Sequence, residues 1–599
     1  MKACGAALAL TGALCGGATT AFAQELRFST TQPGNVIAAG NTLGLAKQLG
    51  LNGPGTEDSI GTFSTLVPGS VDDFPLNPGN PWFEGTTNDW HDNGSTAILE
   101  IPNEAQILYA EVVWGGSFQY GDENVLADLN SSITLSAGGD SITVDPDPTT
   151  AVTVNVAGTF PIRYYMRSAD VSAFVANHPG GEFAVEGVPA TQSAISNTTN
   201  AAGWTLVLAY RYDGEPIRNM SVFVGGLFVD EDTTVDYAVD GFCAPPSEPI
   251  EGTIAIATLE GDSDRTGDQL AIGETIADPT FVTLDGPNNP ENNFFCSQIN
   301  GPDGLLDTTG TFGDRNHTPG SNTSGGRQGW DVTHLELTSD AGHLVPDQTS
   351  AVLRTQTNDD SYMPVLAGIA IDVNAPKFLY DNSTTSVDKD SVGIGDTFTL
   401  DVRLLNEGSA PANDLVFTLD LPAGIALNAF ETNGAPGDIN GAMVTLPMLG
   451  TGVPMGDLSS NEDVTVSATF EVTAAQADDI DLRPVWGYEY RICVNDQPTN
   501  EVFNASVVSV EYDDTTNEGG GGQGGSGTGG SMGDGGAGNQ GNQGGAGGGS
   551  DDSGFVAIPE GGGFFRCTAN GAGESSGTGA WLVFASALAL GVSRRRRNH

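Results

Sequence analysis

Short apolar runs divided by turn-forming residues dominate the chain from about Phe28 to Val373. Runs such as AQILYAEVVWGGS, SSITLSAGGDSITV and GWTLVLAYRY are rich in Val, Ile, Tyr and Trp and are bounded by Gly, Asn and Asp, as strands are. Their density predicts a β-sandwich or jelly-roll-like region over residues 24–376, here named the head, as one domain or as two subdomains. One short helix is expected in SADVSAFVANH.

The pattern changes after the APKF junction at residues 375–378. From 379 to 512 the apolar residues alternate strictly, as in TFTLDVRLL and LVFTLDL, which is typical of half-buried antiparallel strands. We therefore expect a second, smaller β-sandwich. The predicted fold class of the whole chain is all-β.

The second region also carries a specific sequence pattern. A Gly-Asp-Thr entry at 395–397 is followed by a strand ending in Asn-Glu-Gly at 406–408 and by a strand ending in Asp-Leu-Pro-Ala-Gly at 420–424. This pattern resembles the Ig-like conserved repeat of bacterial surface proteins known as domain of unknown function eleven. The resemblance covers about a fifth of the chain and implies a spacer without catalytic residues. Where longer family members have many copies, this chain has one.

Both ends of the chain indicate export. Residues 1–23 carry Lys2, an apolar run and a small-x-small site ending at Ala23, which together predict a cleaved signal peptide. Export leads into an oxidising compartment, where cysteines pair. After the second region, residues 513–563 form a glycine-rich stretch with too few apolar side chains to fold, so a disordered tether is expected.

The last segment, 564–599, combines Cys567, a short apolar run at 580–592 and the arginines Arg594, Arg595, Arg596 and Arg597. The run is shorter than the roughly 20 residues of a stable membrane span, and the arginines are expected to stay on the cytoplasmic side. Together these features resemble the myxobacterial C-terminal sorting signal, MYXO-CTERM, whose members are cut near the cysteine and retained on the cell surface. The alternative is an ordinary short tail anchor. Either reading implies membrane contact through this segment, and the first adds export and processing machinery as partners.

Charge restricts the partners. The chain has 76 acidic and 21 basic residues and a formal net charge of -55. Such a charge repels phosphate backbones and anionic headgroups, which argues against nucleic-acid binding and favours cations, glycans or proteins. The six histidines have no zinc-binding spacing, and the Gly-x-Ser-x-Gly matches lie in glycine-rich sequence. No catalytic or cofactor-binding residue is therefore assigned, and the protein is not expected to be an enzyme.

Three candidate sites lie in the head. Cys243 and Cys296 are its two mature cysteines and are predicted to form a disulfide, with Cys493 buried and unpaired; the alternative is two separate buried thiols. The stretch EGDSDRTGD offers calcium a cluster of carboxylates, with Arg265 as a competing cation and an acidic solvated turn as the alternative. Trp82 and Trp90 stand in loop-like sequence and are candidates for a sugar-stacking face. The expected calcium ligands are Glu260, Asp262, Asp264 and Asp268.

These features predict a surface-retained structural or adhesin-like protein, attached at the cell surface or outer membrane through its C-terminal region. The head would bind an extracellular glycan or protein. The alternative is a secreted, glycan-active hydrolase with a catalytic N-terminal domain, which would need two convergent carboxylates in a cleft.

Overall fold

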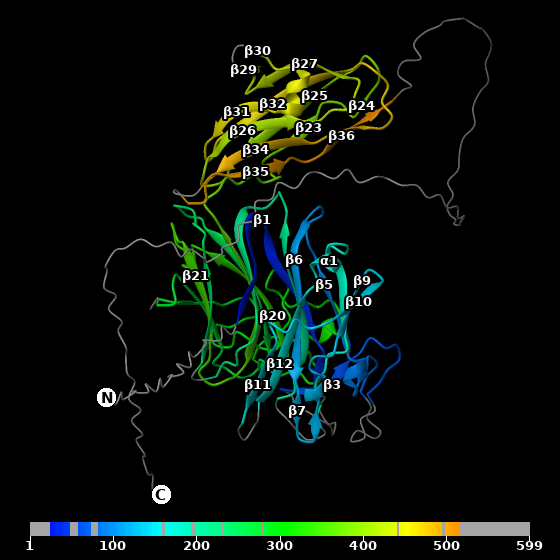
Figure 1. Cartoon of the computed structure of the whole chain (residues 1–599), viewed down its shortest axis with the longest axis vertical. Helices are drawn as coiled ribbons and strands as arrows, with labels where there is room; N and C mark the ends of the chain where they lie inside the picture. The colour runs from blue at the N-terminus through cyan, green and yellow to red at the C-terminus, as the bar shows by residue number, and fades with distance from the viewer. Residues whose placement is uncertain are drawn as a thin grey trace, which may run out of the picture. The chain divides into compact units, whose positions relative to one another are not determined.

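The computed structural model describes residues 24–47, 58–72, 82–157, 162–192, 199–230, 233–277, 280–320, 322–439, 442–493 and 497–513. These residues fold almost entirely into antiparallel β-sheets, so the predicted all-β class is confirmed. Strands β1 to β22 make one group of sheets and strands β23 to β36 another (Figure 1). The first group is the head, and the second is here named the second domain.

The head is built on a nine-stranded sheet. Its order is β11 (Val152–Val156), β12 (Ile162–Asp170), β6 (Gln106–Ser117), β14 (Ala202–Arg211), β1 (Glu25–Thr42), β15 (Ile217–Val224), β22 (Met363–Asp372), β17 (Glu251–Leu259) and β20 (Trp330–Thr338). Two four-stranded sheets accompany it, with the orders β10 (Asp140–Val144), β9 (Ile133–Ala137), β13 (Gly181–Glu186), β5 (Gly94–Leu99), and β16 (Thr234–Asp240), β21 (Ser350–Gln356), β18 (Gln269–Gly273), β19 (Val282–Thr283).

Smaller elements complete the head. They are β2 (Gly44–Ala46), β3 (Ile60–Ser64), β4 (Thr86–Thr87), β7 (Gln119–Tyr120), β8 (Glu123–Asn124) and the 3-10 turns η1 (Trp90–Asp92), η2 (Leu126–Asp128) and η3 (Gly313–Arg315). The expected helix in SADVSAFVANH is present but short, because α1 comprises only Ser172–Val175.

Strand β1 divides the nine-stranded sheet into two halves. Its residues 25–33 pair with β15 and its residues 34–42 pair with β14. The change of partner falls at Gly34, whose φ of 142° favours glycine, and a Cβ there would lie 2.0 Å from the carbonyl oxygen of Tyr210. The two halves face each other across one hydrophobic cluster, in which Val36 and Ala38 of β1 pack with residues of β17 and β20.

The head therefore has four sheet layers with three cores between them. The first core lies between one half of the large sheet and the β10-β9-β13-β5 sheet. The second core lies between the two halves of the large sheet. The third core lies between the other half and the β16-β21-β18-β19 sheet. In β6, for example, Val112 and Trp114 enter the first core, whereas Val113 enters the second. Strands buried on both faces explain the near-continuous apolar runs of the head.

The second domain is a β-sandwich. Its sheets have the orders β23 (Thr385–Val387), β25 (Thr397–Leu405), β32 (Asp463–Val472), β27 (Ile425–Thr432), β28 (Ala435–Pro436); β31 (Val453–Leu458), β26 (Ala412–Leu419), β34 (Pro484–Tyr490), β35 (Thr499–Asn504); and β24 (Ser391–Val392), β36 (Val508–Tyr512), β33 (Ile480–Leu482). A hairpin of β29 (Asp438–Ile439) and β30 (Ala442–Met443) and the helix α2 (Leu446–Thr451) complete it. Alternate residues of β25 and β32 are buried, as the sequence pattern predicts.

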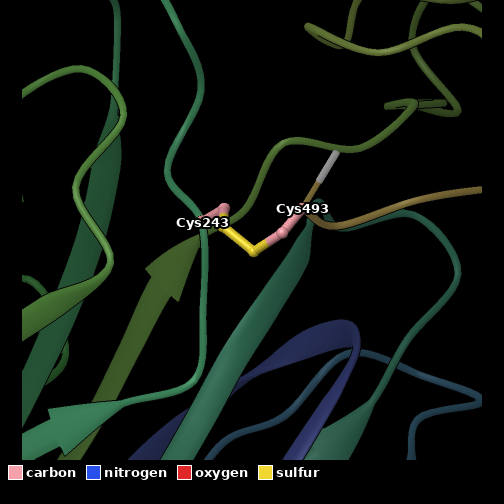
Figure 2. The surroundings of a disulfide bond; sticks show 2 residues. All are labelled: Cys243 and Cys493. Atoms are coloured by element: carbon pink, nitrogen blue, oxygen red, sulfur yellow. A yellow bond between two sulfur atoms is a disulfide. The ribbon is translucent and has the colours of Figure 1, made fainter. Parts of the chain in front are cut away.

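A disulfide joins the head to the second domain. It links Cys243, which follows β16, to Cys493, which follows β34, with 5.6 Å between the Cα atoms (Figure 2). The predicted Cys243–Cys296 bond is therefore wrong, and so is the prediction that Cys493 is unpaired. Cys296 is a buried free thiol whose Sγ donates to the carbonyl oxygen of Asn293. The prediction failed because it assumed that cysteines pair within their own domain.

Candidate functional site: a buried acidic centre in the head

Four carboxylates of the head lie buried where several strands begin or end. Glu260 and Asp262 follow β17, Asp268 precedes β18 and Asp360 precedes β22. Their exposed fractions are 6%, 5%, 0% and 3%, in that order. The register that pairs Leu259 of β17 with both Trp330 and Met363 aligns these strand ends. We name this group of four the acidic centre.

Most oxygens of the acidic centre have no hydrogen bond. Glu260 Oε2, Asp262 Oδ1, Asp360 Oδ2 and both carboxylate oxygens of Asp268 are buried and have no hydrogen bond of normal geometry among the described residues. The Thr357 hydroxyl is nevertheless close enough to Asp268 to act against the rise of its pKa. Arg265 is the basic side chain that reaches the group, with its Nε 3.8 Å from Asp262 Oδ2 and its Nη1 3.9 Å from Asp360 Oδ1. These distances are too long for hydrogen bonds, and the Arg265 side chain is half exposed. The negative charge is thus poorly compensated.

The electrostatic consequence is a raised pKa at each member. Burial is the main cause for all four groups. The neighbouring carboxylates add to it and hold the pKa values of Glu260, Asp262 and Asp268 well above their usual range. For Asp360, burial raises the pKa to about 6 while the backbone amide of Ser361 acts against it.

The turn after β17 is locked by a neighbouring loop. Glu260 has a φ of 60°, a left-handed conformation that is unfavourable for a glutamate. The next residue, Gly261, is so closely packed that a Cβ would lie 2.7 Å from Asp331 Oδ2, and its carbonyl oxygen accepts a hydrogen bond from Ser297. Asp331 Oδ1 in turn accepts from the backbone N–H of Gln298 at 2.9 Å. Burial raises the pKa of Asp331 to about 7.

Two neutral polar groups also lie against the acidic centre. The side-chain nitrogen of Asn293 donates to the Ser263 carbonyl at 2.9 Å, within the loop between Asp262 and Asp268, while Asn293 Oδ1 is buried and unpartnered. The Tyr164 hydroxyl is fully buried and makes no well-formed hydrogen bond. Its pKa is raised by burial and by the charge of Glu260, which places it beside that carboxylate.

The expected calcium ligands thus separate into two environments. Glu260, Asp262 and Asp268 are buried together, whereas Asp264 is exposed and accepts a hydrogen bond from Asn322 at 2.9 Å. Asp360 was missed because it lies almost a hundred residues further along the chain. In the part of the chain that the structure describes, no three His, Cys, Asp or Glu side chains already converge as ligands of one metal ion.

The two tryptophans differ in exposure. Trp82 is 3% exposed and is therefore wrong as a sugar-stacking residue, since its ring is covered by the protein. Trp90 lies in η1, is partly buried against the first core and stacks on His91 with 3.7 Å between ring centroids. The sequence around Trp90 resembles a loop and therefore gave no indication of this packing. Of the two tryptophans, Trp90 remains a candidate for sugar stacking.

An open hollow of about 310 Å³ lies elsewhere on the head. It is lined by residues 37–40 of β1, by 98–100 and by the segment 299–309. The buried Arg327 holds this segment by donating to the carbonyl oxygens of Asp307, Thr309 and Thr311. Leu305, on the same segment, is 53% exposed.

Residues predicted to direct sorting and processing, Ala23, Cys567, Arg594, Arg595, Arg596 and Arg597, lie outside the described residues. Among the helices of the described part, none has the length and apolar character needed to cross a membrane.

Comparison with known proteins gives no family. No family model matches the chain, and no curated protein matches it. Among solved structures, a DUF4785 family protein from Legionella pneumophila is 12% identical with a TM-score of 0.15, and the match covers 50% of this chain and 65% of that one. A β-1,2-glucanase from Parabacteroides distasonis is 12% identical with a TM-score of 0.14, over 49% of this chain and 32% of that one. A membrane anchored protein from Corynebacterium diphtheriae is 8% identical with a TM-score of 0.15, over 81% and 98%.

The chain spans less than two thirds of the length of the first two of these proteins. None of the three TM-scores is high enough to support a shared fold or a shared function.

Proposed function

We propose that this is a surface-retained, adhesin-like protein whose head binds an extracellular glycan or protein and whose second domain is a spacer. The observation that carries the proposal is the Cys243–Cys493 disulfide between the two β-domains. The chain itself joins the domains once, between β22 and β23, and the disulfide adds a second covalent connection. Two connections resist separation of the domains when a ligand on the head and an anchor at the C-terminus are pulled apart.

Contacts beside the disulfide fit the same role. Arg211 of β14 forms an ion pair with Glu501 of β35 at 2.9 Å, and the rings of Tyr212 and Tyr380 pack edge to face with 5.6 Å between centroids. Both contacts join the head to the second domain.

The open hollow between β1 and the segment 299–309 is the ligand site that we assign to the head. Its rim combines exposed apolar surface at Leu305 with carboxylates, a mixture that suits a neutral sugar or a peptide with basic groups. Two of the carboxylates stabilise local turns: Asp303 accepts from the N–H of Leu305 at 2.9 Å, and Asp307 accepts from the N–H of Thr309 at 2.7 Å.

A glycan and whole-cell binding screen with the full-length protein tests the proposal. Leu305→Asp is expected to weaken the binding of any ligand found by at least about tenfold, since it removes an apolar contact and adds a charge. Leu126→Asp is the matched control, because Leu126 is 52% exposed and lies in η2, away from the hollow. Equal loss in both variants would refute this site, and absence of binding to every glycan and cell would refute the adhesin proposal.

The hydrolase alternative is tested in the same samples. Each glycan is incubated with the protein, and new reducing ends are measured. Their appearance would replace the adhesin proposal by a glycan-active enzyme.

A further inference from the structure

We propose that the acidic centre of the head, formed by Glu260, Asp262, Asp268 and Asp360, is a calcium site. It differs from the acidic turn expected from the sequence, because Asp264 lies outside it and Asp360 joins it from another strand end. The site would connect the ends of β17, β18 and β22 through one ion.

The first argument is uncompensated charge. Four buried carboxylates face one half-exposed arginine, and buried charges without partners are strongly unfavourable in a folded protein. A bound divalent cation would compensate most of this charge at once. Protonation of several carboxyl groups is the competing way to remove it, and the measurements below separate the two.

The second argument is the supply of ligand atoms. Five carboxylate oxygens from the four residues are buried and unpartnered. Calcium takes six to eight oxygen ligands in a flexible geometry and accepts carboxylates, amide oxygens and waters. Magnesium demands a near-ideal octahedron, and softer metals prefer sulfur or imidazole ligands. The nearby thiol of Cys296 instead donates to the carbonyl oxygen of Asn293, and burial raises its pKa, which keeps it neutral.

The third argument comes from the two neutral groups. Asn293 Oδ1 is buried and unpartnered, and its own amide nitrogen donates to the Ser263 carbonyl in the loop between Asp262 and Asp268. The buried Tyr164 hydroxyl beside Glu260 also lacks a well-formed hydrogen bond. Such groups are rarely left unpaired in a protein interior unless an ion or a water completes them.

Among the described residues, no three of these carboxylates converge as ligands of one metal ion, so calcium binding requires a rearrangement of the side chains. Calcium is therefore expected to draw the turn after β17, the start of β18 and Asp360 together. Because an ion that binds only the folded head raises its stability, the melting temperature of the protein should rise with calcium concentration.

The experiment compares three full-length proteins, namely wild type, Asp268→Asn and Asp264→Asn. Thermal unfolding is followed in calcium, in magnesium and in chelator, with enough sodium chloride to screen the surface charge. Bound calcium is counted in parallel by equilibrium dialysis. Asp268→Asn has nearly the same shape as the native side chain but removes one unpaired buried charge, whereas Asp264→Asn removes an exposed charge from the same loop.

We expect the melting temperatures of the wild type and Asp268→Asn to change order between chelator and calcium. In chelator, Asp268→Asn should melt above the wild type, because it relieves repulsion. In calcium, the wild type should melt above Asp268→Asn, whose calcium affinity should be at least about tenfold lower. Asp264→Asn should follow the wild type in both solutions, and magnesium should raise the melting temperature less than calcium does.

Unchanged melting of the wild type between calcium and chelator would overturn the proposal, as would equal calcium affinity in Asp268→Asn and Asp264→Asn. If Asp268→Asn fails to fold, Glu260→Gln takes its place with the same expected crossover. If neither variant folds, the calcium count on wild type decides alone: no ion retained in the presence of sodium chloride refutes the site.

Discussion

Removal of the Cys243–Cys493 disulfide should separate the unfolding of the two domains. The bond closes a loop with a sequence separation of 250 residues. In the chain-entropy model, closing a loop of this length raises the free energy of the unfolded chain by about 5.5 kcal/mol at 25 °C, and measured values usually fall below the model. The double variant Cys243→Ala/Cys493→Ala should therefore lose about 3 to 5 kcal/mol of unfolding free energy. The ion pair of Arg211 with Glu501, whose side chains are 18% and 12% exposed, is present with and without the disulfide and therefore does not offset this loss.

The assay is denaturant unfolding of the full-length protein, followed by tryptophan fluorescence and by circular dichroism. We expect coincident transitions for the wild type and separated transitions for the double variant, because the domains are then joined covalently through the chain between β22 and β23 alone and are otherwise coupled by noncovalent contacts. Cys296→Ala is the matched control: it removes a buried thiol from the head, so the transition should shift without dividing. Coincident curves for the double variant, at the midpoint of the wild type, would refute the reasoning. So would a peptide map of unreduced protein that links Cys243 to Cys296.

Two further predictions concern buried basic groups. Arg327→Lys should cost about 2 to 4 kcal/mol, since lysine cannot reproduce the hydrogen bonds to three separate carbonyl oxygens around the hollow; a denaturant midpoint equal to that of the wild type would contradict this. Burial lowers the pKa of His334 from 6.5 to about 4, and its Nε2 accepts from the N–H of Ala38, so the imidazole is neutral in the fold. The unfolded chain binds the proton more readily, so about 3 kcal/mol of stability is present above pH 6.5 and is lost as the pH falls toward 4. The same measurement on His334→Gln should lack this part of the pH dependence, and an identical pH profile would disprove it.

The periodicity of apolar residues predicted most of the fold because it reflects directly which faces of each strand are buried. In the second domain, the alternating residues of TFTLDVRLL became the alternately buried residues of β25. In the head, runs without alternation such as GWTLVLAYRY became β14, which is buried on both faces. The number of layers was not predictable in this way. A run that is apolar on both faces shows that something covers each face but does not say which sheet provides the cover.

Long-range pairing explains the failures at the sites. EGDSDRTGD identified three members of the acidic centre because they are close in sequence, yet the same closeness wrongly included Asp264, whose side chain leaves the turn on the exposed side. Asp360 lies beside Glu260 because β22 pairs with β17. Nothing in the sequence of either strand identifies the other as its partner. The disulfide failed for the same reason on a larger scale, since its partner lies in a different domain.

These failures share a physical origin that bears on the calcium proposal. A carboxylate in a surface turn can stay charged without a partner, so sequence alone favours a solvated turn wherever acids are abundant. The fold changes the outcome, because Glu260 and Asp360 at the strand ends are only 6% and 3% exposed and are thus shielded from water. The same residues that would be unremarkable on the surface then require a counter-ion or a proton. Only the layered fold makes this choice necessary, and the crossover in stability between calcium and chelator is the measurement that shows which of the two the protein uses.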